Sequence, residues 1–334
     1  MSIRQQMTRL AWLVAATSGL GGLSTACSKE EPSPASPASV AQPQSFQFAP
    51  PDGTEYVRTD RRREEIAIVG VPLRKVDEDE LTWNIGIEHR GDQYRVKQEL
   101  VMVDFERDGR TVAKGKPPKG IAAELVIDRD GNLMDVSGLD QAAEVLRSLA
   151  GPGEEAEAER VITPDLLAYV IAMRYRLLFG ETIGRGATPG TSWTISNPPG
   201  SVIMSRTVTV TGQETCDATT CARLKVDFKL DPRQVADAAA DIVKSRVSES
   251  GGDPSKVTVR DASYEMKGSM LVEPATMLSH GAMLNEGGKV TVVDPDQKSV
   301  TVEIKGTTEL SYSYGAGPAA MRSGERTKSS LAAE

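Results

Sequence analysis

Histidine, cysteine and aromatic residues are all scarce in this chain. Its 334 residues include two histidines and three cysteines, and aromatic side chains make up 4%. A histidine base must be held by a carboxylate and face a nucleophile, and neither His89 nor His280 lies beside a recognisable nucleophile motif. Few aromatic rings also leave few platforms on which sugars can stack. We therefore expect a protein that is not an enzyme and binds no cofactor.

An excess of basic residues is also missing. Lys and Arg total 39 against 47 Asp and Glu, which gives a net charge of -8. Such acidity argues against nucleic acid as a partner and against electrostatic adhesion to anionic lipid. Any contact with a membrane must therefore come from another source.

The N-terminus has the organisation of an export signal. Arg4 and Arg9 precede an uncharged, mostly apolar or small stretch over residues 10–23, which is shorter than the roughly 20 strongly apolar residues that span a bilayer. We therefore expect residues 1–26 to be a signal peptide that is removed on export.

The signal ends in Leu23-Ser24-Thr25-Ala26-Cys27, which resembles the lipobox of bacterial lipoproteins. The resemblance implies that the Cys27 thiol receives diacylglycerol, that the chain is cut before it, and that the new amino group is acylated, for example with palmitate. Ser24 departs from the leucine that is more common there. An ordinary secretory signal cleaved after Ala26, leaving Cys27 as a free thiol, remains the alternative.

The expected location follows from the same segment. Two or three acyl chains give a stable anchor, at about 0.8 kcal/mol per buried methylene. Ser28 follows the cysteine, and in enteric-type sorting this resembles lipoproteins of the outer membrane. We expect a cell-envelope protein, anchored through Cys27 to the outer membrane and facing the periplasm.

Composition divides the rest of the chain. Residues 27–51 are rich in Pro, Ser and Ala and should form a disordered tether. Residues 52–314 should form one folded domain, with two similar halves as an open alternative. Residues 315–334 are small and polar and should be a flexible tail.

Hydrophobic periodicity predicts an α+β fold. Residues 222–230 and 300–305 alternate between apolar and polar side chains, as half-buried antiparallel strands do. Residues 139–149, 164–179 and 232–243 show helical spacing. We expect a long, curved, mostly antiparallel sheet with about three helices packed on one face, similar to a half-barrel. The acidic segment 151–160 should be solvated.

One segment carries a family resemblance. Residues 127–138 read IDRDGNLMDVSG and are followed by a helix and later by Gly190-Thr191-Ser192-Trp193. This pattern resembles an uncharacterised family of bacterial envelope lipoproteins over residues 80–310. The resemblance implies a strand, a turn into a helix and a later Gly-x-x-Trp, and it implies no site.

The two remaining cysteines are predicted to form a disulfide. Cys216 and Cys221 bracket four residues between two alternating stretches, and such a pair in an exported protein typically closes a short loop. A redox pair or half of a metal site are the alternatives. The spacing is not C-x-x-C, and no second cysteine pair is present for zinc.

Two sequence patterns suggest metals, but each has a simpler interpretation. Met277, His280 and Met283 offer soft ligands that suit Cu(I), yet Gly281 favours a strand on which they would diverge. The stretch from Asp128 to Asn132 resembles the start of a calcium loop but lacks the later glycine and glutamate. We expect core packing in the first case, a hairpin turn in the second, and no metal.

Two functions remain. The first is an anchored, non-enzymatic module that binds or contacts an envelope protein. The second is a carrier of an apolar ligand or lipid inside a half-barrel cavity. No motif in the sequence identifies a ligand-binding residue.

Overall fold

The computed structural model describes residues 45–70, 72, 74–117, 121–148, 155–197, 201–216, 219–249, 253–256, 258–293 and 299–315. Most of these residues lie in strands. The strands are β1 (Thr54–Ile68), β2 (Arg74–Arg90), β3 (Gln93–Arg107), β4 (Arg110–Gly115), β5 (Ile121–Asp128), β6 (Leu133–Ser137), β7 (Ser192–Ser196), β8 (Ile203–Cys216), β9 (Thr219–Leu230), β10 (Thr258–Val272), β11 (Ser279–Val293) and β12 (Ser299–Tyr314). The helices are α2 (Asp140–Ser148), α3 (Glu155–Val161), α4 (Pro164–Tyr175), its π-helical continuation η1 (Arg176–Gly180), α5 (Pro232–Glu249) and the 3-10 turn η2 (Pro254–Lys256).

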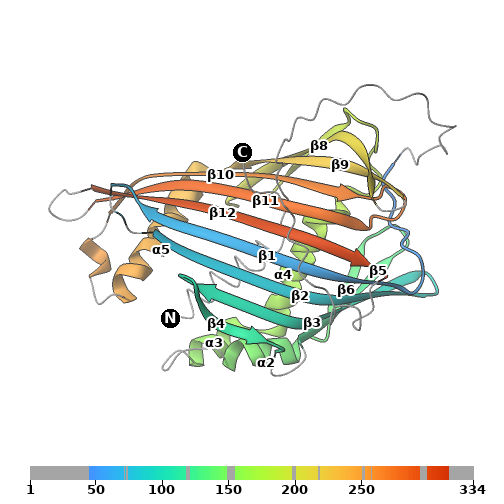
Figure 1. The fold of residues 1–334 in the computed structure, drawn as a ribbon, viewed down its shortest axis with the longest axis horizontal. Helices are drawn as coiled ribbons and strands as arrows, with labels where there is room; N and C mark the ends of the chain where they lie inside the picture. The colour runs from blue at the N-terminus through green and yellow to red at the C-terminus, as the bar shows by residue number, and fades with distance from the viewer. Residues whose placement is uncertain are drawn as a thin grey trace.

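The strands form one antiparallel sheet. Its order is β6-β5-β3-β2-β1-β12-β11-β10-β9-β8-β7, with β4 beside β3. The first six strands and the last six each form a meander, and the two meanders meet where β1 pairs with β12 from Tyr56↔Tyr314 to Ile68↔Val302. Figure 1 shows these central strands crossing the molecule side by side.

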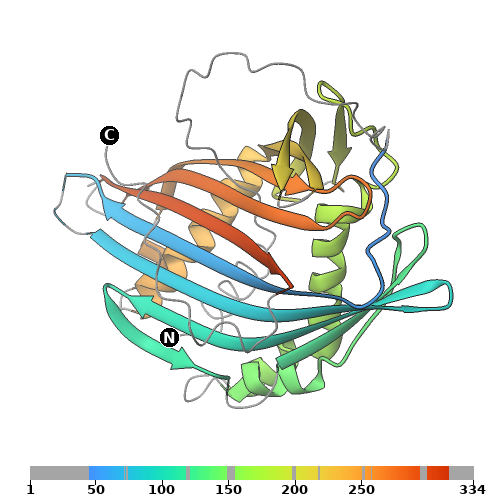
Figure 2. The same ribbon diagram turned by 45° about the vertical axis from the view of Figure 1, so that its right-hand side comes forward.

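The two faces of the sheet differ in character. In Figure 2, α4 and α5 lie on the same side of the sheet, which we call the inner face. The opposite, outer face carries cross-strand ion pairs, including Arg61 with Glu80 and Lys289 with Glu303. Successive residues of a strand point to opposite faces, so these strands divide their side chains between a helix-covered layer and a charged outer layer.

The main hydrophobic core lies on the inner face. Leu224, Met270 and Leu310 project from the sheet and are buried together with Tyr175 from the end of α4. A smaller core forms where Ala143 of α2 packs with residues of α3 and α4. Part of the segment 151–160, which was expected to be solvated, instead forms the start of α3. This helix buries Ala158 in the second core.

The expected α+β class is wrong: the described residues form a mostly β structure with an open, large sheet. The predicted helical stretches do occur as α2, α4 and α5, but they cover a sheet much longer than periodicity indicated. The central strand β1 contains the run Arg61 to Glu65, which places charges on both faces. Apolar and polar positions then no longer alternate, so the pattern that marks a strand is lost.

A short extended segment, residues 45–50, closes one end of the sheet, and we call it the strap. The backbone N–H of Phe46 donates to Arg185 O at 2.9 Å, and Gln47 N–H donates to Pro274 O at 2.8 Å. The Phe46 ring is fully buried and meets Trp193 edge-on, with 6.1 Å between ring centroids. The strap therefore joins loops from both halves of the chain.

Candidate functional site

The inner face holds charged side chains as well as the apolar core. Arg58 and Asp60, both on β1, form an ion pair with 2.7 Å between Nε and Oδ1, and both are buried. The guanidinium lies over the Trp83 ring, 5.3 Å from its centroid. Burial alone would lower the pKa of Arg58, but Asp60 and the neighbouring tyrosines outweigh it and the pKa is raised. Arg58 therefore stays charged inside the protein.

A second buried cluster surrounds Glu286 of β11. Tyr264 Oη donates a hydrogen bond to Glu286 Oε2 at 2.7 Å, and Arg62 Nη2 lies 3.8 Å from Oε1. Arg62 also forms an ion pair with Glu64. Burial raises the pKa of Glu286, although Tyr264 and Arg62 oppose this shift. The arrangement holds a carboxyl group whose neutral form is more favoured than it is in water.

Two glycines make this cluster possible. A Cβ atom on Gly306 would collide with the Glu286 carboxylate, and one on Gly288 would collide with the Tyr264 ring. A glycine at an inward strand position often marks a bulge, strong curvature or the close approach of another element. The structure shows a different reason, which is room for a buried acidic side chain.

A third polar position lies on β8 and β7. Arg206 faces inward opposite Ile195 of β7 and Phe228 of β9, and Trp193 lies opposite Val208. Arg206 is 2% exposed. Within the described residues, Arg206 Nε and Nη1 and Trp193 Nε1 are buried without a hydrogen-bond partner. Sequence reasoning missed this position.

A groove of about 680 Å³ opens at the end of the sheet closed by the strap. We call it the rim groove. It is lined by the strap, by the β2–β3 turn, by the β5–β6 turn and by residues 183–184. Its side chains include the rings of Phe48 and Tyr94, packed edge-on at 5.1 Å between centroids, and the charged groups of Asp92 and Arg129, which form an ion pair.

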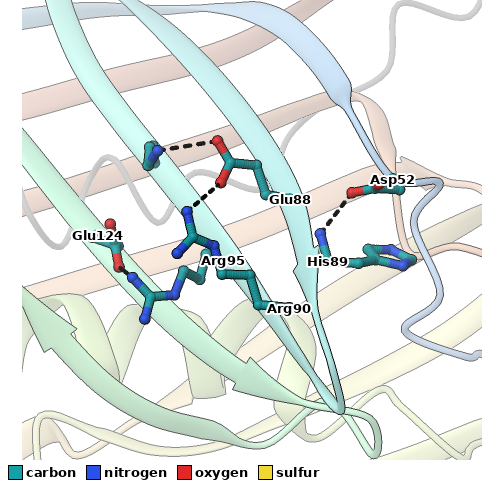
Figure 3. A network of polar contacts seen from close by, with 7 residues as sticks. Asp52, Glu88, His89, Arg90, Arg95 and Glu124 are labelled. Carbon is teal, nitrogen blue, oxygen red and sulfur yellow. Dashed lines mark hydrogen bonds and ion pairs between the residues drawn. The ribbon is translucent and has the colours of Figure 1, made fainter.

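Polar contacts fix the wall of the rim groove (Figure 3). The backbone N–H of His89 donates to Asp52 Oδ1 at 2.7 Å, which lowers the pKa of Asp52. His89 Nε2 shares a hydrogen bond with Pro50 O at 2.7 Å. On the adjacent surface Glu88 binds Lys97 at 3.0 Å, and Arg95 binds Glu124 at 2.9 Å. The β2–β3 hairpin is thus tied to its neighbours on both sides.

The structure brings together Cys216 and Cys221 at the β8–β9 hairpin. They form a disulfide with 5.8 Å between Cα atoms. His280 of β11 adds a third potential metal ligand, since its ring nitrogen and the two sulfur atoms lie within 4.8 Å of one another. Sulfur atoms in a disulfide carry no thiolate for a metal, so this group is not a metal site in its oxidised form.

The other positions singled out from sequence do not form a site. Met277 has a left-handed backbone just before β11, while His280 and Met283 point to opposite faces of that strand, so the three do not converge. The hairpin turn predicted after Asp128 is confirmed, because Asn132 N–H donates to Asp128 Oδ1 at 2.7 Å. Cys27 and the rest of the signal lie outside the described residues, as does the tail from 316.

No helix in the described part of the chain has the length and apolar composition needed to cross a bilayer.

Comparison with known proteins adds little. No family model matches the chain, and no curated protein does. DynF from the dynemicin biosynthesis pathway of Micromonospora chersina is similar over 85% of this chain and 95% of its own, at 9% identity and a TM-score of 0.19. A DUF1329 family protein from Desulfovibrio piger is similar over 78% of this chain and 86% of its own, at 9% identity and a TM-score of 0.13. Scores this low do not establish a common fold.

Proposed function

We propose that this protein is a lipid-anchored, non-enzymatic binding protein of the bacterial cell envelope, facing the periplasm from the outer membrane. Its partner is a segment of another envelope protein, bound in the rim groove. The observation that carries this proposal is the groove itself, whose 680 Å³ lies in the range of established binding sites, about 300 to 1,000 Å³.

The chemistry of the rim groove suits a protein segment. The partly buried ring of Tyr94 supplies aromatic contact area, backed by the buried ring of Phe48, while charged groups at the edge orient a partner. Arg129 and Asp130 lie on the β5–β6 turn and Asp92 on the β2–β3 turn, so both signs of charge border the groove. A segment with an apolar or aromatic side chain flanked by charged residues would complement this lining.

The position of the groove supports an anchored role. The strap contributes Ser45 to Ala49 to its wall, and these residues lie near the end of the segment 27–51 that the sequence predicts to be a tether beginning at Cys27. A lipid on Cys27 would therefore be joined to the domain at the end where the rim groove opens. The His89 imidazole, whose Nε2 shares a hydrogen bond with a backbone carbonyl, supports a structural rather than a catalytic role for this side chain.

The described apolar core favours this proposal over a carrier of wholly apolar ligands. The half of the inner face nearest to α4 is filled by buried or partly buried rings, among them Phe46, Phe48, Tyr175 and Phe179. An apolar guest would have to displace them.

Crosslinking in living cells tests the binding site. A photoreactive residue at Gln93, in the rim groove, should capture one discrete envelope protein, whereas the same probe at Lys289 on the outer face should not. Adding Tyr94→Ala and Arg129→Glu should abolish the Gln93 product, and the control Arg63→Ala should preserve it. Equal capture from both positions, or a product that survives the groove substitutions, would overturn the proposal.

Labelling with palmitate tests the anchor. The wild-type chain should incorporate label, and Cys27→Ala should incorporate none and appear in the soluble periplasmic fraction. Label that persists in Cys27→Ala would overturn the assignment of this cysteine.

A further inference from the structure

Arg206 interrupts a buried, apolar row of the sheet. On β8 the residues that share its face, Val208 and Val210, are almost completely buried, and Phe228 stands opposite on β9. Arginine is almost never fully buried unless it is paired. An apolar side chain of similar size would fit the pattern of these strands, so packing does not explain an arginine here.

Two of the three guanidinium nitrogen atoms of Arg206, Nε and Nη1, lack a hydrogen-bond partner in the part of the chain that the structure describes. The carboxylate of Glu181, an exposed residue just after η1, attracts the guanidinium electrostatically. Burial nevertheless dominates and lowers the pKa of Arg206 to about 10. The group remains charged at neutral pH.

Trp193 adds a second unsatisfied donor beside it. The indole Nε1 is buried without a hydrogen-bond partner in the described residues. Trp193 and Arg206 lie on the same face of neighbouring strands, since Trp193 pairs with Val208 and Ile195 pairs with Arg206. Side chains at such diagonal positions are within reach of one another when they are long or aromatic.

Both groups can only donate hydrogen bonds. Guanidinium and indole nitrogens have no acceptor capacity, and the guanidinium fork matches two oxygen atoms of one carboxylate or phosphate. A buried water molecule could meet one donor but would not neutralise the charge. Ile195, Val208 and Phe228 lie opposite or beside these positions in the sheet and are apolar. The part of a ligand that follows its charged group must therefore be apolar, and on binding it would displace buried rings such as Phe46, which packs against Trp193.

We infer that Arg206 and Trp193 bind the oxyanion head group of an amphiphile, such as the carboxylate of a medium-chain acid. This site is separate from the rim groove and adds a small-molecule ligand to the protein partner proposed above. The exposed carboxylate of Glu181, just after η1, attracts the same guanidinium. Glu181 then competes with the ligand for the same guanidinium.

Titration calorimetry with the full chain carrying Cys27→Ala, which removes the anchoring lipid, tests the site. Octanoate should bind at one site, and octanol, which differs only in its uncharged head group, should bind at least tenfold more weakly. Inorganic phosphate supplies the oxyanion without the apolar body and should also bind at least tenfold more weakly. Equal binding of octanoate and octanol, equal binding of phosphate, or no binding of octanoate would overturn the inference.

Substitutions separate a binding role from a structural one. Arg206→Leu should lose at least tenfold in octanoate affinity while keeping or raising the melting temperature of the unliganded protein, because an unpaired buried charge is removed. Arg206→Lys keeps the charge without the fork and should bind octanoate with intermediate affinity. Glu181→Gln removes the competing carboxylate and should bind octanoate severalfold more tightly. A lower melting temperature for Arg206→Leu together with unchanged octanoate affinity in Glu181→Gln would show that the pair is structural and overturn the site.

Discussion

Ion pairs on the inner and outer faces of this sheet have nearly the same geometry in different surroundings. Arg58 and Asp60 approach to 2.7 Å on the inner face with side chains 8% and 3% exposed, and Arg61 and Glu80 approach to 2.8 Å on the outer face with side chains 59% and 41% exposed. Water competes for the outer pair, whereas the inner charges depend on each other. Distance alone therefore does not indicate what an ion pair contributes.

The largest effect should come from breaking the inner pair. Asp60→Ala leaves Arg58 charged and buried, and we expect a loss of about 3 to 5 kcal/mol in the free energy of unfolding. Urea denaturation followed by circular dichroism measures it. The double variant Arg58→Met with Asp60→Leu should recover most of the loss, because both charges are then gone. A loss below about 1 kcal/mol for Asp60→Ala would contradict the proposed dependence of the two charges.

A smaller effect should come from filling the space beside Glu286. Gly306→Ala forces a methyl group against the buried carboxylate, and overpacking of this kind costs about 1 to 3 kcal/mol. The matched control is Gly86→Ala on β2, where nothing lies within 4 Å of the added atom. Thermal unfolding should separate the two variants. Equal stability would show that the Glu286 side chain can move aside freely.

The pH dependence of stability should also distinguish the faces. Burial raises the pKa of Glu286 in the folded protein. The protonated carboxyl therefore stabilises the folded protein fully at pH values below the pKa that Glu286 has in the unfolded chain. This stabilisation is lost as pH rises through the pKa of the folded protein. Glu286→Gln removes this dependence. Relative to wild type, the variant should become more stable as pH rises from 4 to 8, as measured by denaturation at each pH. A constant difference across this range would contradict the shifted pKa.

The smallest effect is expected on the outer face. Arg61→Ala breaks an exposed pair with Glu80 and should change the free energy of unfolding by less than about 1 kcal/mol. The change should shrink further in high salt, because salt screens exposed charges. The same urea titration, repeated at two salt concentrations, provides the measurement. A loss as large as that for Asp60→Ala would remove the distinction between the faces.

Sequence periodicity could predict strands only where one face is apolar. The stretch from Ala222 to Leu230 shows this alternation and forms most of β9. In β1 the charges from Arg61 to Glu65 belong to two different environments, with Arg62 and Glu64 inside and Arg61 and Arg63 outside. Residue type alone does not distinguish a charge paired across strands from one exposed to water, so the extent of the sheet was underestimated.

The candidate sites were less predictable than the strands. The rim groove combines the strap with three turns that are far apart in sequence, and no local pattern brings such segments together. The sequence does contain a signal for Arg206. This arginine occupies an inward position of an alternating run whose next inward residues are the apolar Val208 and Val210. The sequence signal for the buried Glu286 is weaker. It consists of Gly306, a glycine at an inward strand position, which leaves room for the Glu286 side chain on the neighbouring strand.

The strap gives the protein a mechanical property. Its first residues are held by backbone hydrogen bonds from Phe46 to Arg185 and from Gln47 to Pro274, so a pull on the chain at residue 45 reaches these bonds before it reaches any strand of the sheet. Under tension these few bonds carry the load and are the first to yield. Because the strap lines the rim groove, tension transmitted from the proposed anchor would reshape the groove while leaving the sheet intact.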